Sequence, residues 1–355
     1  MARQWILDSQ DGFEKSLQYQ TNVEVPSPES LGANQVLVKL HGASLNYREL
    51  VIAGPMGVNG PITPPVVPGC DGAGIVEAVG SSVSEFKSGD RVVTFLAPNL
   101  AERDGDDAIA DVTEALDALG QGPDGTLRSI AVFHEKALVH APKNLELLEA
   151  STLSCTWLTA WNALFGVRGQ EVGPGSWVLV QGTGGVSIAA LQVAVAAGAT
   201  VVATTSSEEK ASRLKALGAT AVVNYRSSPD SWGKEARALT PGGKGFDMVI
   251  DIGGNETLPH SLAAVRKDGM IVVVGGVGSN AETVPLFTVM LHACIVRGIL
   301  GGSRTQLKET VRFVEEKGLK PVVDDVVFEL AEAKDAYRRL KEKKHFSKVV
   351  LRIDH

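Results

Sequence analysis

The sequence predicts an α/β protein built from two domains, and three observations lead to this prediction. The chain has 355 residues, enough for two domains of roughly 100–200 residues, each with a buried core. Before residue 150, short apolar runs are separated by glycine and proline turns, which favours a small β-barrel. From residue 177 onward, apolar runs alternate with helical segments, which is typical of a doubly wound parallel sheet with helices on both faces.

Composition excludes several classes of protein. Hydrophobic residues make up 44% and charged residues 21% of the chain, which excludes wholesale disorder. The net charge of −7 argues against binding to nucleic acid or an anionic membrane, which needs a basic face. No apolar run reaches the roughly 18 residues of a membrane span, and the first residues do not resemble a signal peptide. The three cysteines, Cys70, Cys155 and Cys294, lie far apart and form no disulfide framework, so we expect a cytoplasmic protein.

Local patterns place the individual elements. In the N-terminal part, residues 36–40, 74–80 and 90–95 are predicted to be strands, whereas five prolines between residues 55 and 68 exclude a helix there. In the second part we expect the alternating order strand 177–181, a helix to about 197, strand 200–204, helix 208–217, and strands 221–223, 248–251 and 271–274. Two amphipathic helices between residues 307 and 340, and a strand at 349–352, complete the chain.

One segment holds most of the charge imbalance. Residues 102–124 contain eight acidic residues and one arginine, so this segment accounts for the whole net charge of −7. We expect it to include a short helix around 107–119, with acids in the first turn, where the helix dipole favours them. A solvated surface excursion and a flexible lid over the active site are both compatible with this composition.

A glycine-rich turn between a predicted strand and helix indicates a dinucleotide site. Gly182 permits the tight turn, Gly184 lets the backbone approach a pyrophosphate, and Gly185 begins the helix with Val186, where free N–H groups attract the anion. The third glycine of this fingerprint is replaced by Ser187, which is still small enough for close helix–strand packing. The alternative is an ordinary glycine turn, which the surrounding strand–helix–strand pattern disfavours.

The end of the second strand favours NADPH over NADH. An NAD-specific site would carry an acidic residue there, but the sequence has the neutral Thr205, followed by Ser206 and by Lys210. Hydroxyls and a lysine can bind a 2′-phosphate, whereas a carboxylate would repel it. The alternative is that the serines only cap the next helix and that Lys210 lies on its solvated face.

Eight ordered motifs resemble the medium-chain dehydrogenase/reductase superfamily, and among them is Pro-Val-Val-Pro-Gly-Cys-Asp-Gly-Ala-Gly-Ile-Val-Glu-Ala-Val-Gly. They lie at residues 43–50, 65–80, 86–92, 158–161, 215–219, 224–226, 297–304 and 345–351. The resemblance implies a GroES-like β-barrel catalytic domain formed by residues 1–155 and 298–355, with a Rossmann cofactor domain at 156–297. It also implies an active site between the two domains, a homo-oligomer (dimer or tetramer), and a small-molecule substrate.

The resemblance also bears on zinc. Zinc alcohol dehydrogenases of this superfamily use cysteine, histidine and cysteine ligands with a glutamate after the histidine, and the matching positions here are Asn46, Cys70, Cys155 and Asp71. The first ligand is therefore an amide and the histidine is lost, so we expect a metal-free site with two buried, structural cysteines. An unusual Cys70/Cys155/Asp71 zinc site remains the alternative.

Matching positions imply further cofactor contacts. They place the hydroxyl of Thr159 beside the nicotinamide, together with the backbone of Gly275, Gly276, Leu300 and Gly301. They place Tyr225 and Lys210 near the adenosine phosphate, and Lys348 at the pyrophosphate. For Lys348 an exposed lysine at the end of a strand is an equally good interpretation. Arg304 is expected to be an exposed turn arginine, and the alternative is that it reaches the active-site cleft.

Two residues are candidates for catalysis. Asn46 can hold a carbonyl oxygen through its amide, and Tyr47 can donate a proton through its phenol. The alternatives are that Asn46 fixes a turn and that Tyr47 packs under the cofactor. Enoyl-thioester reductases of the superfamily carry a catalytic tyrosine before the glycine that matches Gly57, and this chain has Met56 there, which disfavours their route.

Taken with the resemblance, these residues predict an NADPH-dependent reductase of a quinone or an α,β-unsaturated carbonyl that works without catalytic zinc. Without a Lewis acid, the conjugated carbonyl itself delocalises the charge that develops on hydride transfer. The alternatives are an alcohol dehydrogenase or carbonyl reductase with the unusual zinc site, and a dinucleotide-binding protein with little turnover.

Overall fold

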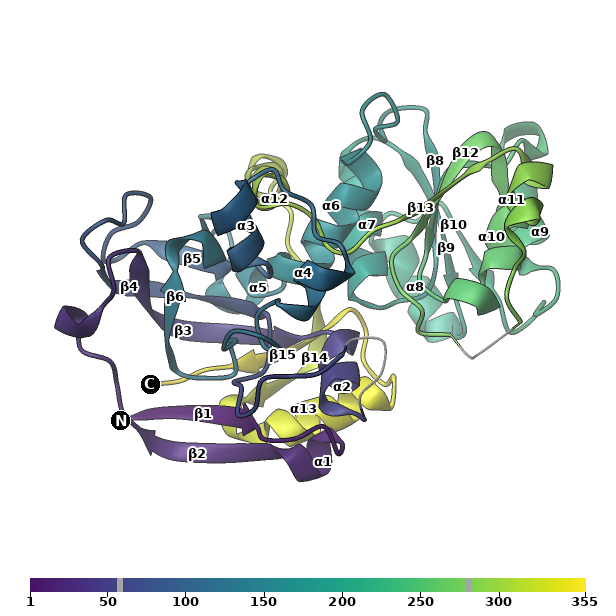
Figure 1. Ribbon diagram of the computed structural model, residues 1–355. Helices are drawn as coiled ribbons and strands as arrows, with labels where there is room; N and C mark the ends of the chain where they lie inside the picture. The colour runs from purple at the N-terminus through teal and green to yellow at the C-terminus, as the bar shows by residue number, and fades with distance from the viewer. Residues whose placement is uncertain (56–59, 279–281) are drawn as a thin grey trace. The chain divides into compact units, whose positions relative to one another are not determined.

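The computed structural model describes residues 1–55, 60–278 and 282–355 (Figure 1). The chain divides into two compact units, one formed by residues 1–158 and 300–355 and the other by residues 159–299. The boundaries expected from the sequence differ from these by three and two residues. No helix in the described ranges combines the length and apolar character needed to cross a bilayer.

The first unit is built on a seven-stranded, mostly antiparallel sheet. Its strand order is β14-β15-β3-β4-β5-β7, and β6 pairs with β3. A separate hairpin, β1 (Ala2–Leu7) with β2 (Leu17–Val23), packs beside it. The bounds of the sheet strands are β3 Gln35–Leu45, β4 Asp71–Val79, β5 Arg91–Thr94, β6 Ile130–His134, β7 Leu138–His140, β14 Val323–Glu329 and β15 Lys348–Arg352.

The last strand of the chain completes this sheet. β15 pairs antiparallel with β3, with Val349 opposite Leu45, although the two strands lie about 300 residues apart in sequence. The helices of the unit are α1 Phe13–Ser16, α2 Tyr47–Ala53, α3 Pro98–Asp104, α4 Val112–Leu116, α5 Leu147–Ala150, α12 Arg304–Lys317 and α13 Ala333–Lys341, and a π-helical turn spans Leu153–Trp157. The unit thus joins the two ends of the chain in one core.

The second unit confirms the predicted parallel sheet. Its order, β10-β9-β8-β11-β12-β13, is the Rossmann order 3-2-1-4-5-6 when the strands are numbered along the chain. The strands are β8 Trp177–Val180, β9 Thr200–Thr205, β10 Ala221–Asn224, β11 Phe246–Asp251, β12 Val265–Val273 and β13 Ile295–Gly298. The helices are α6 Leu158–Phe165, α7 Gly185–Ala196, α8 Glu208–Ala216, α9 Trp232–Ala238, α10 Leu258–Ala264 and α11 Leu286–His292. The order reverses between β8 and β11, where folds of this class bind their ligands.

Two local predictions need correction. The tail contains the strand β14 between its two helices, and this strand was not predicted because its residues, Val-Asp-Asp-Val-Val-Phe-Glu, show no regular alternation of apolar and polar side chains. The helix expected at 107–119 forms only over α4, and a further helix, α3, precedes it. Asp111 does begin α4 as an acidic cap, because its side chain accepts a hydrogen bond from Thr113 N at 2.7 Å.

The acidic segment is anchored to the first unit rather than solvated along its whole length. Ala118 and Leu119 are buried, and the backbone N–H of Leu119 donates to Leu96 O at 2.9 Å. The carboxylate of Asp106 binds the buried guanidinium of Arg304, at 2.6 Å. These contacts disfavour a flexible lid, because opening the segment would break a buried core contact and an ion pair together.

Candidate active site

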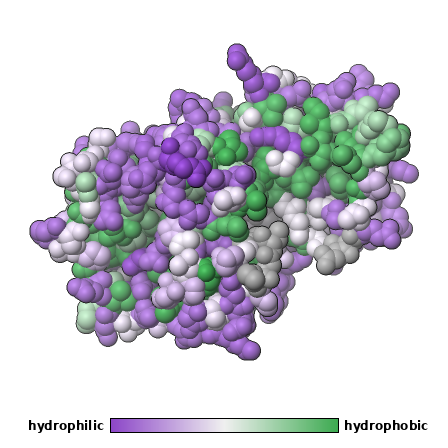
Figure 2. Space-filling view, viewed as in Figure 1, coloured by the Kyte–Doolittle hydropathy of each residue, from purple (hydrophilic) through white to green (hydrophobic). Residues whose placement is uncertain are grey.

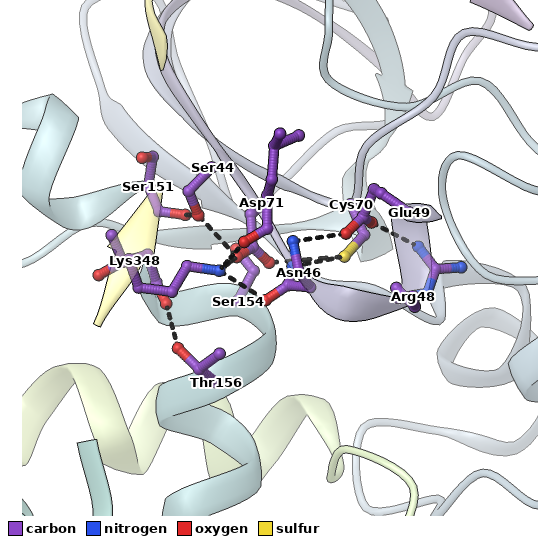
Figure 3. A network of polar contacts seen from close by, with 12 residues as sticks. Ser44, Asn46, Arg48, Glu49, Cys70, Asp71, Ser151, Ser154, Thr156 and Lys348 are labelled. Atoms are coloured by element: carbon purple, nitrogen blue, oxygen red, sulfur yellow. Dashed lines mark hydrogen bonds and ion pairs between the residues drawn. The ribbon is translucent and has the colours of Figure 1, made fainter. Parts of the chain in front are cut away.

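A polar cluster forms where three strands of the first unit meet (Figure 3). Sheet register creates it, because Ser44 of β3 lies opposite Asp71 of β4, and β15 begins at Lys348 beside the end of β3. Asp71 is fully buried, and its Oδ2 accepts hydrogen bonds from the Ser44 hydroxyl at 2.8 Å and from Lys348 Nζ at 2.9 Å. The cluster therefore contains a buried ion pair whose carboxylate is also hydrogen-bonded, as a buried charge requires.

The structure corrects the interpretation of Lys348. Its side chain is 2% exposed and not at the surface. Its ammonium donates to Asp71, to Leu45 O at 2.8 Å and to Asn46 Oδ1 at 2.5 Å. An ammonium group has three donors and all three are used, so none is left for the pyrophosphate contact that the resemblance implied.

Both catalytic candidates lie at the start of α2. Asn46 is the residue before this helix and is 8% exposed; its amide accepts from Lys348 and donates to Cys70 Sγ at 3.6 Å. Tyr47 is 47% exposed. The structure thus puts Asn46 within the polar cluster, whereas whether either residue acts in catalysis stays a prediction. Met56, together with Gly57, lies outside the described residues.

A second buried acid stands next to Asn46 and was not predicted. Glu49 is 2% exposed, accepts from the backbone N–H of Asn46 at 2.6 Å, and pairs with Arg48 at 3.1 Å. Burial raises the pKa of Glu49, although Arg48 opposes this effect. The spacing of Asn46 and Glu49 could have predicted this contact, since an acid three residues after an Asn cap is typical of the first turn of a helix.

In the second unit, the glycine turn is tight and leaves open space before α7. Gly182 has φ +75°, a conformation that favours glycine. A Cβ atom added to Gly184, the residue before α7, would meet no atom within 4 Å, so there is open space over the helix N-terminus. Ser187 is buried, and its hydroxyl donates to Gln181 O at 2.6 Å. Serine at the third fingerprint position therefore ties the helix to the strand before it.

Residues expected near the adenosine phosphate come together at the ends of β9 and β10. The N–H of Tyr225 donates to Thr205 O at 3.0 Å, and the side chain of Tyr225 is 37% exposed. Ser207 caps α8, because its hydroxyl accepts from the backbone N–H of Lys210 at 3.3 Å. Ser206 and Lys210 are partly exposed, as a phosphate contact requires. A serine can cap this helix N-terminus while the same N-terminus binds a phosphate, so the two interpretations are compatible.

A buried carboxylate at the reversal point of the sheet was missed. Asp251 ends β11 and is fully buried, and the residue before it, Ile250, pairs with Val180 at the end of the neighbouring strand β8. Its two oxygens accept five hydrogen bonds, from Gly253 N (3.1 Å), Gly254 N (3.0 Å), Thr257 Oγ1 (2.7 Å), Ser261 Oγ (2.5 Å) and Gln181 Nε2 (3.4 Å). The available signal was a charged residue closing an apolar strand just before two glycines.

The loop that Asp251 holds borders the expected nicotinamide stretch. Val277 N donates to Ile252 O at 3.0 Å, and a Cβ added to Gly254 would lie 3.4 Å from the Cα of Gly276. Gly276 itself faces open space. Of the other expected contacts, Thr159 is buried in α6, and Leu300 and Gly301 belong to the first unit. The second unit thus brings the glycine turn, the Asp251 loop and Gly276 to one edge of its sheet.

Arg304 is not an exposed turn arginine, as was expected. Its guanidinium is fully buried; it donates to Glu85 Oε2 at 2.9 Å, to Asp106 Oδ2 at 2.6 Å and to Leu138 O at 2.6 Å. Lys308, one turn along α12, reaches the same two carboxylates. Burial raises the pKa of Glu85, but Arg304 and Lys308 more than offset this effect and lower it to about 2. The residue is a buried anchor for the acidic segment.

Family models match most of both units. The model described as alcohol dehydrogenase GroES-like domain matches residues 32–143, and the model described as zinc-binding dehydrogenase matches residues 185–316. Together with the relatives below, these matches confirm the resemblance. The chain belongs to the medium-chain dehydrogenase/reductase superfamily, with a GroES-like domain and a Rossmann-type domain, and it is an oxidoreductase of that family.

Relatives with different activities resemble the chain along most of its length. A zinc-type alcohol dehydrogenase-like protein from Schizosaccharomyces pombe is 42% identical, with full coverage of both chains. A quinone oxidoreductase from Rattus norvegicus is 29% identical over 88% of this chain and 86% of its own length. A solved structure described as an NAD-dependent alcohol dehydrogenase superimposes with a TM-score of 0.85 at 36% identity, covering 99% of this chain and 100% of that chain.

The residues at the zinc-ligand positions fit zinc poorly. Donor atoms of Cys70, Asp71 and Cys155 lie within 4.8 Å of one another, close enough for one ion. However, the Asp71 carboxylate is already neutralised by Lys348, and the oxygen of Asn46 accepts from the same ammonium. A divalent cation beside this ammonium would be repelled, and an amide is a weak substitute for a thiolate or imidazole.

Proposed function

We propose that the chain is an NADPH-dependent reductase that transfers a hydride to a quinone or an α,β-unsaturated carbonyl without catalytic zinc. The observation that carries the zinc-free part is the ammonium of Lys348, which is bound to Asp71 and Asn46, two of the residues that match the zinc-site positions. The buried lysine thereby supplies a positive charge to this carboxylate and amide in place of a metal ion.

The polar cluster supports activation of a carbonyl by hydrogen bonding. Lys348 donates to Asn46 Oδ1, and such a bond polarises the amide, which makes its N–H groups stronger donors. Asn46 would then bind the substrate oxygen on which charge develops, and the phenol of the exposed Tyr47 would supply a proton. When bound, the reduced nicotinamide supplies the hydride.

The cofactor proposal depends on the second unit. Open space over the N-terminus of α7 suits a pyrophosphate, and β9 ends at the neutral Thr205. Ser206 and Lys210 would bind the 2′-phosphate beside Tyr225. Two acids in the first turn of α8, Glu208 and Glu209, weaken this attraction, although Asn224 donates a hydrogen bond to Glu208 at 3.1 Å.

An alcohol dehydrogenase or carbonyl reductase with bound zinc is the second candidate. It is favoured by the proximity of Cys70, Asp71 and Cys155, and by relatives whose names include alcohol dehydrogenase. Zinc binding there would need both thiols to lose their protons and Asp71 to share its charge between the metal and Lys348.

Turnover and metal content separate these candidates. We expect purified protein to oxidise NADPH with quinones or enones, to contain well under one zinc per chain, and to keep its activity after treatment with a chelator. One zinc per chain, lost together with activity on chelation, would contradict the zinc-free proposal. NADPH binding without oxidation across quinones, enones and aldehydes would instead indicate a binding protein with little turnover.

The choice of cofactor has its own test. Lys210→Ala should weaken NADPH binding about tenfold, the effect of losing one charged contact worth about 1.4 kcal/mol, and should leave NADH binding nearly unchanged. Lys215→Ala, which removes an exposed lysine from the same helix, is the matched control. Equal weakening of both cofactors by Lys210→Ala contradicts a 2′-phosphate contact.

We also propose that the chain forms a homo-oligomer through its second unit. Large apolar side chains are exposed along α11, and β13 is the last strand of the parallel sheet in the described part of the chain. An exposed sheet edge beside an apolar helix suits pairing with a second copy of the same chain. A cytoplasmic location remains a prediction from the sequence.

A further inference from the structure

Two thiols from separate parts of the first unit come together beside the polar cluster. Cys70 directly precedes β4, and Cys155 lies in the π-helical turn Leu153–Trp157. Their sulfur atoms lie within 4.8 Å of one another. Cys294 belongs to the other unit. The first unit therefore carries a close pair of thiols.

The two thiols of the pair differ in exposure. Cys155 is partly exposed, whereas Cys70 is fully buried, so a small oxidant from solvent reaches Cys155 first. This arrangement gives one sulfur the role of the first reactant and the other the role of the second.

Polar neighbours hold the buried thiol beside Cys155. Asp71 Oδ1 accepts a hydrogen bond from the S–H of Cys70 at 3.5 Å, and Asn46 Nδ2 donates to the same sulfur at 3.6 Å.

We propose that Cys70 and Cys155 form a peroxide-sensitive dithiol that closes to a reversible intramolecular disulfide. The thiol of Cys155 loses its proton and its sulfur attacks hydrogen peroxide, so that an S–O bond forms, the O–O bond breaks, and the sulfur loses two electrons to become a sulfenic acid; the leaving hydroxide takes the thiol proton and departs as one water. The sulfur of Cys70 then attacks this sulfur as its own proton is lost; the S–S bond forms and the S–O bond breaks. The leaving hydroxide takes the proton as a second water, so one peroxide converts two thiols into one disulfide and two waters.

Closure requires the sulfur atoms to approach from at most 4.8 Å to about 2.05 Å. Both cysteines lie on irregular backbone, since Gly69, before Cys70, has φ +92° and Cys155 lies in a π-helical turn. Such segments adjust more readily than the middle of a regular helix or strand.

Counting free thiols tests the proposal without any measurement of turnover. Reduced protein is treated with hydrogen peroxide, unfolded in the presence of N-ethylmaleimide, and weighed by mass spectrometry. We expect three adducts before oxidation and one afterwards, a Cys70–Cys155 cross-linked peptide with Cys294 alkylated, and three adducts again after dithiothreitol. Because no cofactor or substrate is used, the outcome is independent of the proposed reductase activity.

Three serine variants serve as controls. Cys294→Ser should go from two adducts to none, while Cys155→Ser should keep both of its adducts because the buried Cys70 is protected. Cys70→Ser should give oxidised Cys155 with no cross-linked peptide. Retention of all three adducts in the unsubstituted protein overturns the proposal. So does further oxidation of Cys155 while Cys70 remains alkylatable, or a disulfide between two chains.

Discussion

Single residues of this chain take roles that depend on partners far away in the sequence. Arg304 looks like a turn arginine, but it is buried against Glu85 and Asp106, which lie 219 and 198 residues earlier. Lys348 is similarly committed to Asp71, 277 residues earlier. No local pattern signals such pairs, since they arise only when the two ends of the chain join one core. Burying a charge is tolerable only when partners of this kind are present.

Removal of the buried guanidinium should destabilise the first unit strongly. Arg304→Met leaves Leu138 O and two carboxylates with fewer donors, and we expect the free energy of unfolding to fall by about 3 kcal/mol in urea titrations. Arg312→Met, on the exposed side of the same helix, is the matched control and should change it by less than about 0.5 kcal/mol. Similar values for the two variants would contradict the anchoring role of Arg304.

The same two carboxylates should make stability sensitive to acid. Burial raises the pKa of Glu85 and of Asp106, but Arg304 and Lys308 lower both to about 2, from ordinary values of 4.5 and 3.8. Below about pH 5 the unfolded chain therefore binds more protons than the folded chain, so stability falls as the pH falls towards 2. The loss is at most about 1.4 kcal/mol per pH unit for each group, and less because both are partly exposed.

Urea titrations at several pH values check this expectation. The double variant Glu85→Gln with Asp106→Asn should be less stable than the unsubstituted protein near neutral pH, and its stability should fall less steeply between about pH 5 and pH 3. An equal acid slope in both proteins would show that other groups control the acid sensitivity.

At the scale of elements, the parallel sheet of the second unit was predictable, whereas the strand pairing of β14 with β15 in the first unit was not. The turn from β8 to α7 is encoded within a few residues by Gly182 and Gly184, so it could be predicted with its function. The strand β14 pairs with β15 across helix α13, and nothing in its own sequence marks that pairing. The polar cluster was predicted only in part: its residues, Lys348 included, were identified, but the bonds from Lys348 to Asp71 and Asn46 join distant parts of the chain and were not predicted.

The element that Asp251 organises should control cofactor affinity. Asp251→Asn replaces one acceptor oxygen with a donor facing Ser261 and Gln181, which should shift the loop that packs against Gly276. We expect the Kd for the reduced cofactor, measured by fluorescence titration, to rise about tenfold, a cost of about 1.4 kcal/mol. Ser261→Ala, which removes one of the five donors and keeps the carboxylate, should give a smaller rise.

A matched control separates positioning from general damage. Asp268→Asn changes an exposed carboxylate of β12, in the same sheet, and should leave the Kd unchanged. Thermal unfolding of each variant shows how much of the effect is loss of fold. If Asp251→Asn lowers stability while the folded fraction binds cofactor with unchanged Kd, the carboxylate supports the sheet without positioning the cofactor.

At the scale of the whole molecule, charge and apolar surface are each concentrated in one place. The acidic segment at 102–124 carries the net charge of −7 and is tied to the first unit through Asp106. Apolar side chains gather over α11 in the second unit, as Figure 2 shows. They are Leu286 (83% exposed), Phe287 (62%), Met290 (62%) and Leu291 (67%), with Ile295 (42%) beside them on β13. A surface of this kind on a single helix is typical of an interface.

Charges placed on α11 should therefore separate the proposed oligomer. We expect the unsubstituted protein to sediment as a dimer or tetramer, and Phe287→Asp with Leu291→Asp to sediment as a smaller species, because burying two unpaired carboxylates opposes association. Ile109→Asp, at another exposed apolar side chain (52%), should leave the mass unchanged. Circular dichroism must show that the double variant is folded. A monomeric unsubstituted protein, or a double variant of unchanged mass, would place the interface elsewhere and leave the apolar face of α11 without a role in self-association.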